Sequence, residues 1–356
     1  GPSEICVLAD KETDINQIST SLVSQAEHDP ESQCILITKD KSIVKRVQSE
    51  IKKILSSKQN IVITTHVNPD GDAIGSSIAL LNFLIKQGHN TSIIVPNDYP
   101  DFLKWMKNDE LVINFSNSKK ESQEKIKNAS LIFCLDFNNL TRINELGKYI
   151  SESNATKVLI DHHLEPSNFY DYKIHDVNAS ATAELVYNFL VEIDSDLIDK
   201  YISEALYTGI LTDTGSFKFS MSSKVHHIVA ELMDRGIDIT FINNKIYDSN
   251  SLDKLKLIGY ALSEKLEVIS NGNVAYIVLS RKDLIDHNFK KGDTEGLVNY
   301  ALSIHNVNMA VLIIETKERI KFSFRSTGKF SVNEFAKKHF NGGGHKNAAG
   351  GSLEDK

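Results

Sequence analysis

Short runs of apolar, mostly β-branched residues alternate with longer amphipathic stretches along this chain. The run at 61–65 (IVITT) is typical of a strand buried on both faces, and further strands are expected at 91–96, 130–135 and 157–160. Residues 76–87 carry apolar positions at helical spacing and are followed by Gly88, which predicts a helix that ends there. This order of strand and helix predicts an α/β fold with a mainly parallel sheet and crossover helices.

Both ends of the chain continue the pattern. Before the first apolar run we expect a strand at 4–9, a helix at 14–25, a strand at 34–38 and a helix at 42–55. Beyond it we expect a short helix at 101–106, a helix at 204–211 and a strand at 322–327. The predicted organisation is an N-terminal segment at 1–50, a larger α/β domain at 51–249 and a smaller α/β domain at 250–356.

The composition narrows the class of protein. With 356 residues, of which 41% are hydrophobic and 24% charged, we expect a globular protein with two or three cores. The chain has no apolar run of membrane-spanning length and no signal peptide pattern. Cys6, Cys34 and Cys134 lie far apart in strand-like runs, which predicts reduced thiols and a cytoplasmic location. The missing apolar run argues against a membrane as partner, and the net charge of −7 argues against duplex DNA.

Four segments end in acidic or histidine side chains. The first run breaks into His66, Asp70 and Asp72, and we expect Gly71 to provide a sharp turn that brings the two carboxylates together. The later clusters are Asp136, then Asp161 with His162 and His163, and finally Asp213. An isolated Asp-x-Asp is equally typical of a loop followed by a helix cap. Because ligands bind at the carboxyl ends of strands in open α/β sheets, the recurrence predicts one shared site.

The side-chain types in these clusters favour a metal centre. All are carboxylates or imidazoles, and no cysteine is among them. Such a set suits Mn²⁺ or Mg²⁺ better than a structural zinc, and it is large enough for two ions that share a bridging carboxylate. Two neighbouring ions are a known arrangement for hydrolysis of phosphoesters. The clusters therefore predict a metal-dependent phosphoesterase.

A glycine-rich motif near the C-terminus suggests a second, anion-binding element. Backbone N–H groups of Gly342, Gly343 and Gly344 could line up on a phosphate oxygen, and His345 adds a donor. Arg325 can make a bidentate contact to a phosphate or a base. The alternative is a flexible glycine loop without a ligand.

The motifs occur in the order of a known family. HVNPDGDAIGSS, CLDFNN, LIDHH and TGILTDTGSF resemble the four motifs of the DHH phosphoesterases, and FSFRST and FNGGGHKNAAGG resemble those of the DHH-associated domain. The resemblance runs from about residue 50 to the end, and KGDTEGLVNY is most similar to the nanoRNase and pAp phosphatase branch. It implies that the metal ligands are His66, Asp70, Asp72, Asp136, His162 and Asp213. It also implies that Asp136 bridges two ions, that His163 faces the scissile phosphate and that Asp161 orients its histidine neighbours.

The resemblance further implies a Mn²⁺-dependent enzyme, with Mg²⁺ left open, that acts on short single-stranded RNA. Its products would be mononucleotides from short oligoribonucleotides, AMP from 3′-phosphoadenosine 5′-phosphate (pAp), or both. The implied substrate-binding residues are Arg325, Gly342, Gly343, Gly344 and His345. The linear dinucleotide pApA as substrate and a homodimer as assembly stay open. A longer-substrate exonuclease would need a basic, aromatic-lined channel, and a non-catalytic binding module would be expected to lack some ligands.

The first 50 residues resemble a different family. The series GPSE, SQAEH and ILIT is similar to histidinol dehydrogenase, in which the residues matching Gln25 and His28 bind zinc. This resemblance stops near 47–53, and two ligands cannot complete a zinc site. We therefore expect a truncated fragment joined to an otherwise complete phosphoesterase.

Overall fold

The structure is a computed structural model that describes residues 4–8, 33–37, 50–219, 222–269, 272–317 and 319–354. In the N-terminal segment, β1 (Glu4–Leu8) pairs in parallel with β2 (Gln33–Ile37), close to the strands expected there. Residues 50–54 are helical, whereas the rest of the helices expected at 14–25 and 42–55 lies outside the described residues.

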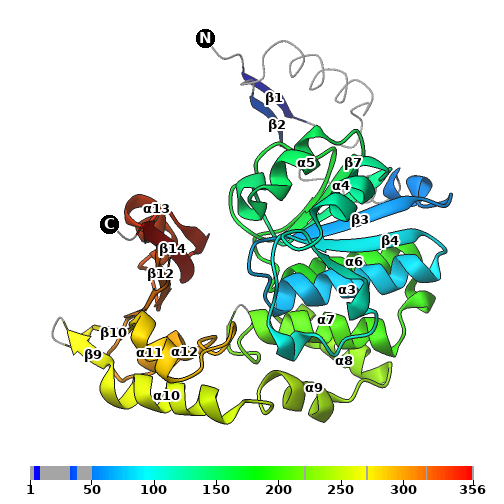
Figure 1. The fold of residues 1–356 in the computed structure, drawn as a ribbon. Helices are drawn as coiled ribbons and strands as arrows, with labels where there is room; N and C mark the ends of the chain where they lie inside the picture. The colour runs from blue at the N-terminus through cyan, green and yellow to red at the C-terminus, as the bar shows by residue number, and fades with distance from the viewer. Residues whose placement is uncertain are drawn as a thin grey trace.

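A six-stranded sheet forms the centre of the first domain, and all its neighbouring strands run parallel (Figure 1). The strand order is β5-β4-β3-β6-β7-β8. The strands are β3 (Asn60–Thr65), β4 (Asn90–Val95), β5 (Val112–Asn114), β6 (Leu131–Leu135), β7 (Thr156–Asp161) and β8 (Tyr172–His175). The predicted parallel α/β architecture is confirmed.

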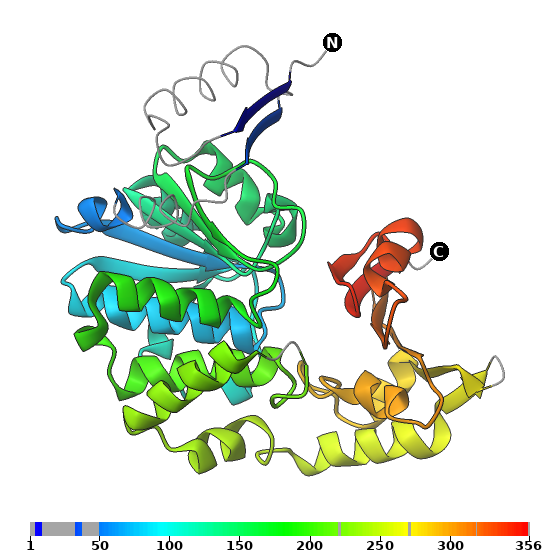
Figure 2. The ribbon, with the colours of Figure 1, turned by 180° about the vertical axis from the view of Figure 1, so that it is seen from behind.

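Helices cover both faces of this sheet (Figures 1 and 2). Alternate residues of β3 point to opposite faces, so that Ile61 and Ile63 join one apolar core and Val62 joins the other. The first core is covered by α3 (Gly71–Lys86), α6 (Thr182–Asp194), α7 (Lys200–Asp213), α8 (Ser223–Asp234) and α9 (Ile239–Ile246). The second is covered by α4 (Lys119–Lys127) and α5 (Leu146–Glu152). Short 3-10 turns are η1 (Asp101–Leu103), where a longer helix was expected, η2 (Asp109–Leu111), η3 (Leu140–Ile143) and η4 (Ser195–Leu197).

The start of α3 differs from the sequence prediction. Asp70 caps the helix because its Oδ1 accepts hydrogen bonds from the backbone N–H groups of Asp72 and Ala73, both at 3.1 Å, so the helix begins at Gly71. Gly71 is therefore helical and does not form the expected sharp turn. It is needed for close packing, since a Cβ there would lie 2.3 Å from Thr212 Oγ1. The close approach of α3 to α7 brings Asp72 toward Asp213.

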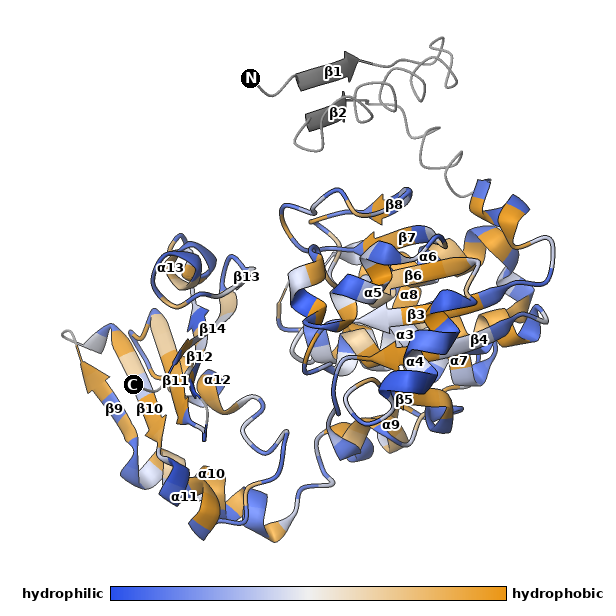
Figure 3. Ribbon diagram, turned by 45° about the horizontal axis from the view of Figure 1, so that its top comes forward, coloured by the Kyte–Doolittle hydropathy of each residue, from blue (hydrophilic) through white to orange (hydrophobic). Residues whose placement is uncertain are grey.

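The second domain contains a smaller, mixed sheet with the order β13-β14-β12-β11-β10-β9. Its strands are β9 (Leu266–Ile269), β10 (Val274–Leu279), β11 (Met309–Glu315), β12 (Arg319–Ser326), β13 (Gly343–His345) and β14 (Ala348–Glu354). One face packs on α10 (Leu252–Glu264), α11 (Arg281–Asp286) and α12 (Leu297–Leu302), and the other on α13 (Val332–His339). Apolar residues dominate strands of both sheets, among them β6 and β10 (Figure 3).

The two domains lie on either side of a cleft, and α9 and α10 follow one another along its base (Figures 1 and 2). The second domain reaches the first through an ion pair between Lys337 Nζ and Glu165 Oε2, 2.7 Å apart. A further bridge is the hydrogen bond that Lys291 Nζ donates to the carbonyl oxygen of Asp98. None of the described helices combines the length and apolar character needed to cross a bilayer.

Candidate metal centre

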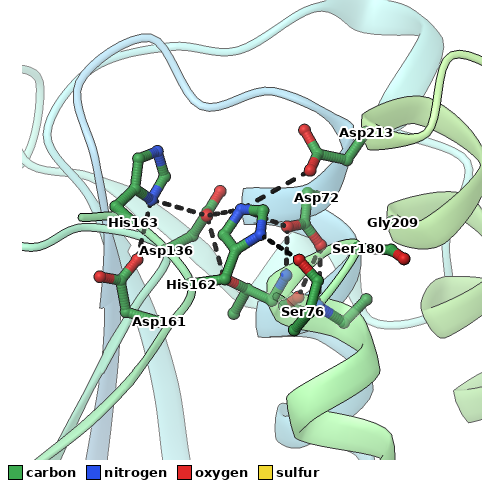
Figure 4. A network of polar contacts seen from close by, with 12 residues as sticks. Asp72, Ser76, Asp136, Asp161, His162, His163, Ser180, Gly209 and Asp213 are labelled. Carbon is green, nitrogen blue, oxygen red and sulfur yellow. Dashed lines mark hydrogen bonds and ion pairs between the residues drawn. The ribbon is translucent and has the colours of Figure 1, made fainter. Parts of the chain in front are cut away.

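Side chains from the ends of three neighbouring strands and two helices meet at one edge of the parallel sheet. Figure 4 shows those that follow or end β6 and β7 together with Asp72 and Asp213 from the helices. His66 follows β3, Asp136 follows β6 and Asp161 ends β7. The structure brings together all the acids and histidines that the sequence singled out for this centre, which are His66, Asp70, Asp72, Asp136, Asp161, His162, His163 and Asp213. Most of these side chains are buried, so the site is a cluster of buried polar groups at the margin of the hydrophobic core.

These residues form overlapping groups that could each hold a cation, and two of the groups together contain all six expected ligands. One group is His66, Asp70 and Asp136, and the other is Asp72, His162 and Asp213. Asp136 lies between them, with Oδ2 3.4 Å from His66 Nε2 and Oδ1 3.6 Å from His162 Nε2. One carboxylate therefore faces both groups, as a bridging ligand must.

The histidines are oriented as metal ligands usually are. His66 Nδ1 donates to the carbonyl oxygen of Val67 at 2.9 Å, and His162 Nδ1 donates to that of Ala179 at 3.0 Å. Because a carbonyl oxygen only accepts, each ring carries its proton on Nδ1 when neutral. The lone pair of Nε2 then points at the carboxylates, where a cation would lie.

The first turn of α6 holds two of the carboxylates. Asp72 accepts hydrogen bonds from the backbone N–H groups of Thr182 at 2.6 Å and Ala183 at 2.9 Å, and the Thr182 hydroxyl donates to Asp136 Oδ1 at 3.0 Å. Asp136 itself has a left-handed backbone with φ of 63°, a conformation that Asp tolerates better than most residues. The sequence analysis did not identify Thr182 or Ala183, since backbone donors leave no side-chain signature.

Burial and mutual repulsion perturb these groups. Burial, followed by the charge of Asp136, raises the pKa of Asp72, and burial raises the pKa of Asp213 to about 7. Burial lowers the pKa of His162, but the charges of Asp213, Asp136 and Asp72 outweigh it and raise that pKa to about 9. Burial opposes ionisation of Asp136 as well, yet the hydrogen bond from His66 and the nearby imidazoles hold its pKa well below the usual range. A divalent cation would offset this repulsion, so the donor set fits Mn²⁺ or Mg²⁺.

His163 lies beside these two groups and is held by Asp161. Asp161 Oδ1 accepts from His163 Nδ1 at 2.8 Å, while the other oxygen of Asp161, Oδ2, has no partner among the described residues. The expected orienting role thus has a geometric basis for His163, whereas the carbonyl oxygen of Ala179 orients His162. The His345 ring from the second domain stacks on His163, with centroids 4.4 Å apart. Burial, followed by the nearby histidines, lowers the pKa of His345 to about 3, so its ring is neutral.

The glycine motif has a different role from the expected anion nest. The N–H of Gly342 donates to the Ala336 carbonyl oxygen at 3.2 Å, and that of Gly344 donates to Asn333 Oδ1 at 3.0 Å. These amides are therefore already paired. A Cβ at Gly342 would lie 1.9 Å from the Gly350 carbonyl oxygen, so glycine there permits the tight β13–β14 hairpin. Gly342, Gly343 and Gly344 do not line the cleft, and the hairpin instead presents the residues that follow them.

The cleft beside this centre has a volume of about 720 Å³. Asp70, His162 and Asp213 line one wall, and the other wall is lined by residues of the second domain, among them Arg325, His345 and Lys346. An acidic wall that can hold cations thus faces a wall that carries positive charge. This arrangement suits a phosphorylated ligand placed between the two domains.

Fold and site together define a two-domain α/β protein with a paired carboxylate and histidine centre in its interdomain cleft. Sequence models of the DHH family N-terminal domain and of the DHHA1 domain match residues 60–210 and 271–356. An exopolyphosphatase-related protein from Bacteroides fragilis, known from a crystal structure, is 39% identical in sequence to this chain. The two structures superpose with a TM-score of 0.83, and the match covers 88% of this chain and 92% of that one. The chain therefore belongs to the DHH family and is a metal-dependent phosphoesterase.

Two curated relatives have names that state an activity. The probable bifunctional oligoribonuclease and PAP phosphatase NrnA of Streptococcus mutans is 28% identical over 300 residues, which are 83% of this chain and 90% of the relative. The Bacillus subtilis bifunctional oligoribonuclease and PAP phosphatase NrnA is 26% identical over 86% of this chain and 93% of the relative.

The N-terminal segment has a separate similarity. A sequence model of histidinol dehydrogenase matches residues 1–77, farther along the chain than the expected end near 47–53, and overlaps the DHH match from residue 60. Gln25 and His28 lie outside the described residues. The overlap includes His66, Asp70 and Asp72, which belong to the candidate metal centre described above.

Proposed function

We propose that this enzyme hydrolyses short oligoribonucleotides to mononucleotides and pAp to AMP, with Mn²⁺ as the working ion. One observation carries the proposal, namely that Asp136 faces both candidate ligand groups at 3.4 and 3.6 Å. The activities stated in the names of the two curated relatives support the choice of substrates. The buried free thiol of Cys134 is compatible with the reducing cytoplasm, where we place the enzyme.

In this proposal two ions are held by His66, Asp70, Asp72, Asp136, His162 and Asp213, with Asp136 shared. When bound, the ions would supply positive charge for the phosphate and activate water for hydrolysis. The chain supports this chemistry by fixing the ligands. Asp70 keeps one oxygen on the α3 amides and turns the other toward His66, 3.7 Å away. Asp161 fixes the orientation of the His163 ring beside the phosphate site.

The second domain would hold the rest of the substrate. Arg325 and His345 line the wall opposite the ligands, so a phosphate or base beyond the scissile bond would lie against them. A cleft of this volume favours substrates of a few nucleotides over long strands. We place the boundary between the catalytic domain at 51–249 and the substrate-binding domain at 250–356, since α9 ends at Ile246 and α10 begins at Leu252.

The test is turnover of pAp, pApA and RNAs of increasing length, each with Mn²⁺ and with Mg²⁺. The proposal expects rapid hydrolysis of pAp and of the shortest RNAs, and a steep fall in rate as the strand lengthens. Preference for long strands would indicate the exonuclease alternative. Tight binding of these ligands without turnover under either metal would overturn the assignment.

A further inference from the structure

A second cavity of about 590 Å³ adjoins the cleft on the side of α9, α10 and α12. Its volume lies within the range of about 300–1,000 Å³ that is usual for ligand sites. None of the proposed metal ligands lines it. The two cavities share a border made of Thr212, Gly215, Lys218, Glu295, Asn299 and Arg325.

The lining of this second cavity combines aromatic rings with cations. The aromatic residues are Phe102, Tyr247 and Tyr300, and the cations are Lys218, Lys254 and Arg325. Glu295 is its one carboxylate among the described residues. The rings come from both domains, since Phe102 lies in η1 and Tyr300 lies in α12. Aromatic faces interleaved with cations are typical of surfaces that stack the bases of single-stranded nucleic acids.

The rings are accessible for stacking. Tyr300 is 54% exposed and Tyr247 is 38% exposed, so neither ring is consumed by core packing. The Lys254 ammonium lies 5.8 Å from the centre of the Phe102 ring, which places positive charge beside an aromatic face. Side-chain amides of Asn250 and Asn299 also line the cavity and can donate to or accept from the edge of a base.

We propose that this cavity binds the second nucleoside of a substrate whose scissile phosphate lies at the metal centre. The inference rests on the proposed function and adds to it a site that distinguishes dinucleotides from mononucleotides. Arg325 and Lys218 border both cavities, so the substrate passes these two cations on its way from the metal centre into the second cavity. The base then stacks against Tyr300, the more exposed of the two tyrosine rings, and its edge meets the asparagine amides.

The experiment compares pApA, which has two nucleosides, with pAp, which has one. Base stacking on an aromatic ring is worth a factor of about 5 to 150 by alanine substitution. In Tyr300→Ala we therefore expect the ratio of kcat/KM for pApA to that for pAp to fall at least about fivefold. Tyr300→Phe keeps the ring and should hold the ratio within about twofold. Tyr201→Ala serves as the control for an exposed aromatic residue elsewhere, since Tyr201 is 49% exposed on α7.

An unchanged ratio in folded Tyr300→Ala would overturn the inference, and so would equal losses on both substrates. Calorimetric binding of pApA and pAp in EDTA separates this site from the proposed activity. If Tyr300→Ala binds pApA more weakly than the wild type does while its binding of pAp is unchanged, the second site is supported. This holds even where neither nucleotide is turned over. If the wild type binds pApA no more tightly than pAp without metal, the cavity does not hold the second base.

Discussion

Thr182→Val tests whether the first turn of α6 prepares the metal centre. Valine has nearly the shape of threonine and lacks the hydroxyl that donates to Asp136 Oδ1 at 3.0 Å, whereas the backbone N–H bond to Asp72 at 2.6 Å remains. Thr182 is fully buried, so water cannot replace the lost donor. A carboxylate oxygen has two lone pairs and can accept this bond while it binds a cation.

The expected magnitude follows from the charge on the acceptor. A hydrogen bond to a charged group contributes about 1.5–3 kcal/mol, which corresponds to a factor of about 10 to 150 in an equilibrium constant. Groups that orient metal ligands typically change metal affinity about 10- to 100-fold when they are removed. We therefore expect Thr182→Val to bind Mn²⁺ at least about tenfold more weakly.

Isothermal titration of the metal-free protein with Mn²⁺ measures this effect directly, independently of catalysis. Thr182→Ser retains the hydroxyl and should bind Mn²⁺ nearly as the wild type does. Thr64→Val is a matched control, because Thr64 is also fully buried and its hydroxyl has no partner among the described residues. Wild-type affinity in Thr182→Val, or an equal loss in Thr64→Val, would refute the argument that this hydroxyl positions Asp136.

Three further predictions concern the metal, the substrate wall and the core. Mn²⁺ at 100 times its Kd should stabilise the protein by about 2.7 kcal/mol, which is measured as a higher Tm. Asp136→Asn, in which asparagine tolerates the left-handed backbone, should abolish both this rise in Tm and hydrolysis. Normal turnover by this variant would refute the shared-ligand scheme. Arg325→Ala and His345→Ala should raise KM for pAp with little change in Mn²⁺ affinity, and unchanged KM in both would exclude this wall as the substrate site. Phe133→Ala, in the buried centre of β6, should lower the free energy of unfolding in urea by about 3–5 kcal/mol, whereas a loss below about 1 kcal/mol would contradict tight packing there.

The metal centre could be predicted from sequence because its chemistry resides in side chains. Asp136 and His162 follow or end apolar runs that predict adjacent parallel strands, and parallel strands bring such ends to one edge. Because these strands are neighbours in the sheet, residues that are far apart in the chain lie close enough together to bind the same metal ion. Asp70 has the geometry for both interpretations of its motif, since one of its oxygens caps α3 and the other faces His66.

Other features could not be predicted because they depend on tertiary contacts. Two of the three hydrogen bonds from α6 come from backbone N–H groups, which every residue but proline carries, and the third comes from the hydroxyl of Thr182, a residue that no sequence motif singled out. Gly71 and Gly342 were both attributed to local backbone freedom, whereas each is required because another chain segment passes too close for a Cβ. A single sequence does not state which segment will be the neighbour.

The two domains contribute different parts of the proposed site, so metal binding and substrate binding depend on different domains. All the proposed metal ligands come from the first domain, so metal binding does not require the cleft to be closed. His345, however, stacks on His163 at 4.4 Å, and the exposed pair of Lys337 and Glu165 contributes only about 0–1 kcal/mol to holding the domains together. A substrate that contacts both walls at once therefore adds to these interdomain interactions. A ligand that spans the cleft gains binding energy from contacts to both walls, whereas a ligand that touches only the metal wall lacks the second set of contacts. This difference favours short nucleotides whose phosphates and bases reach Arg325.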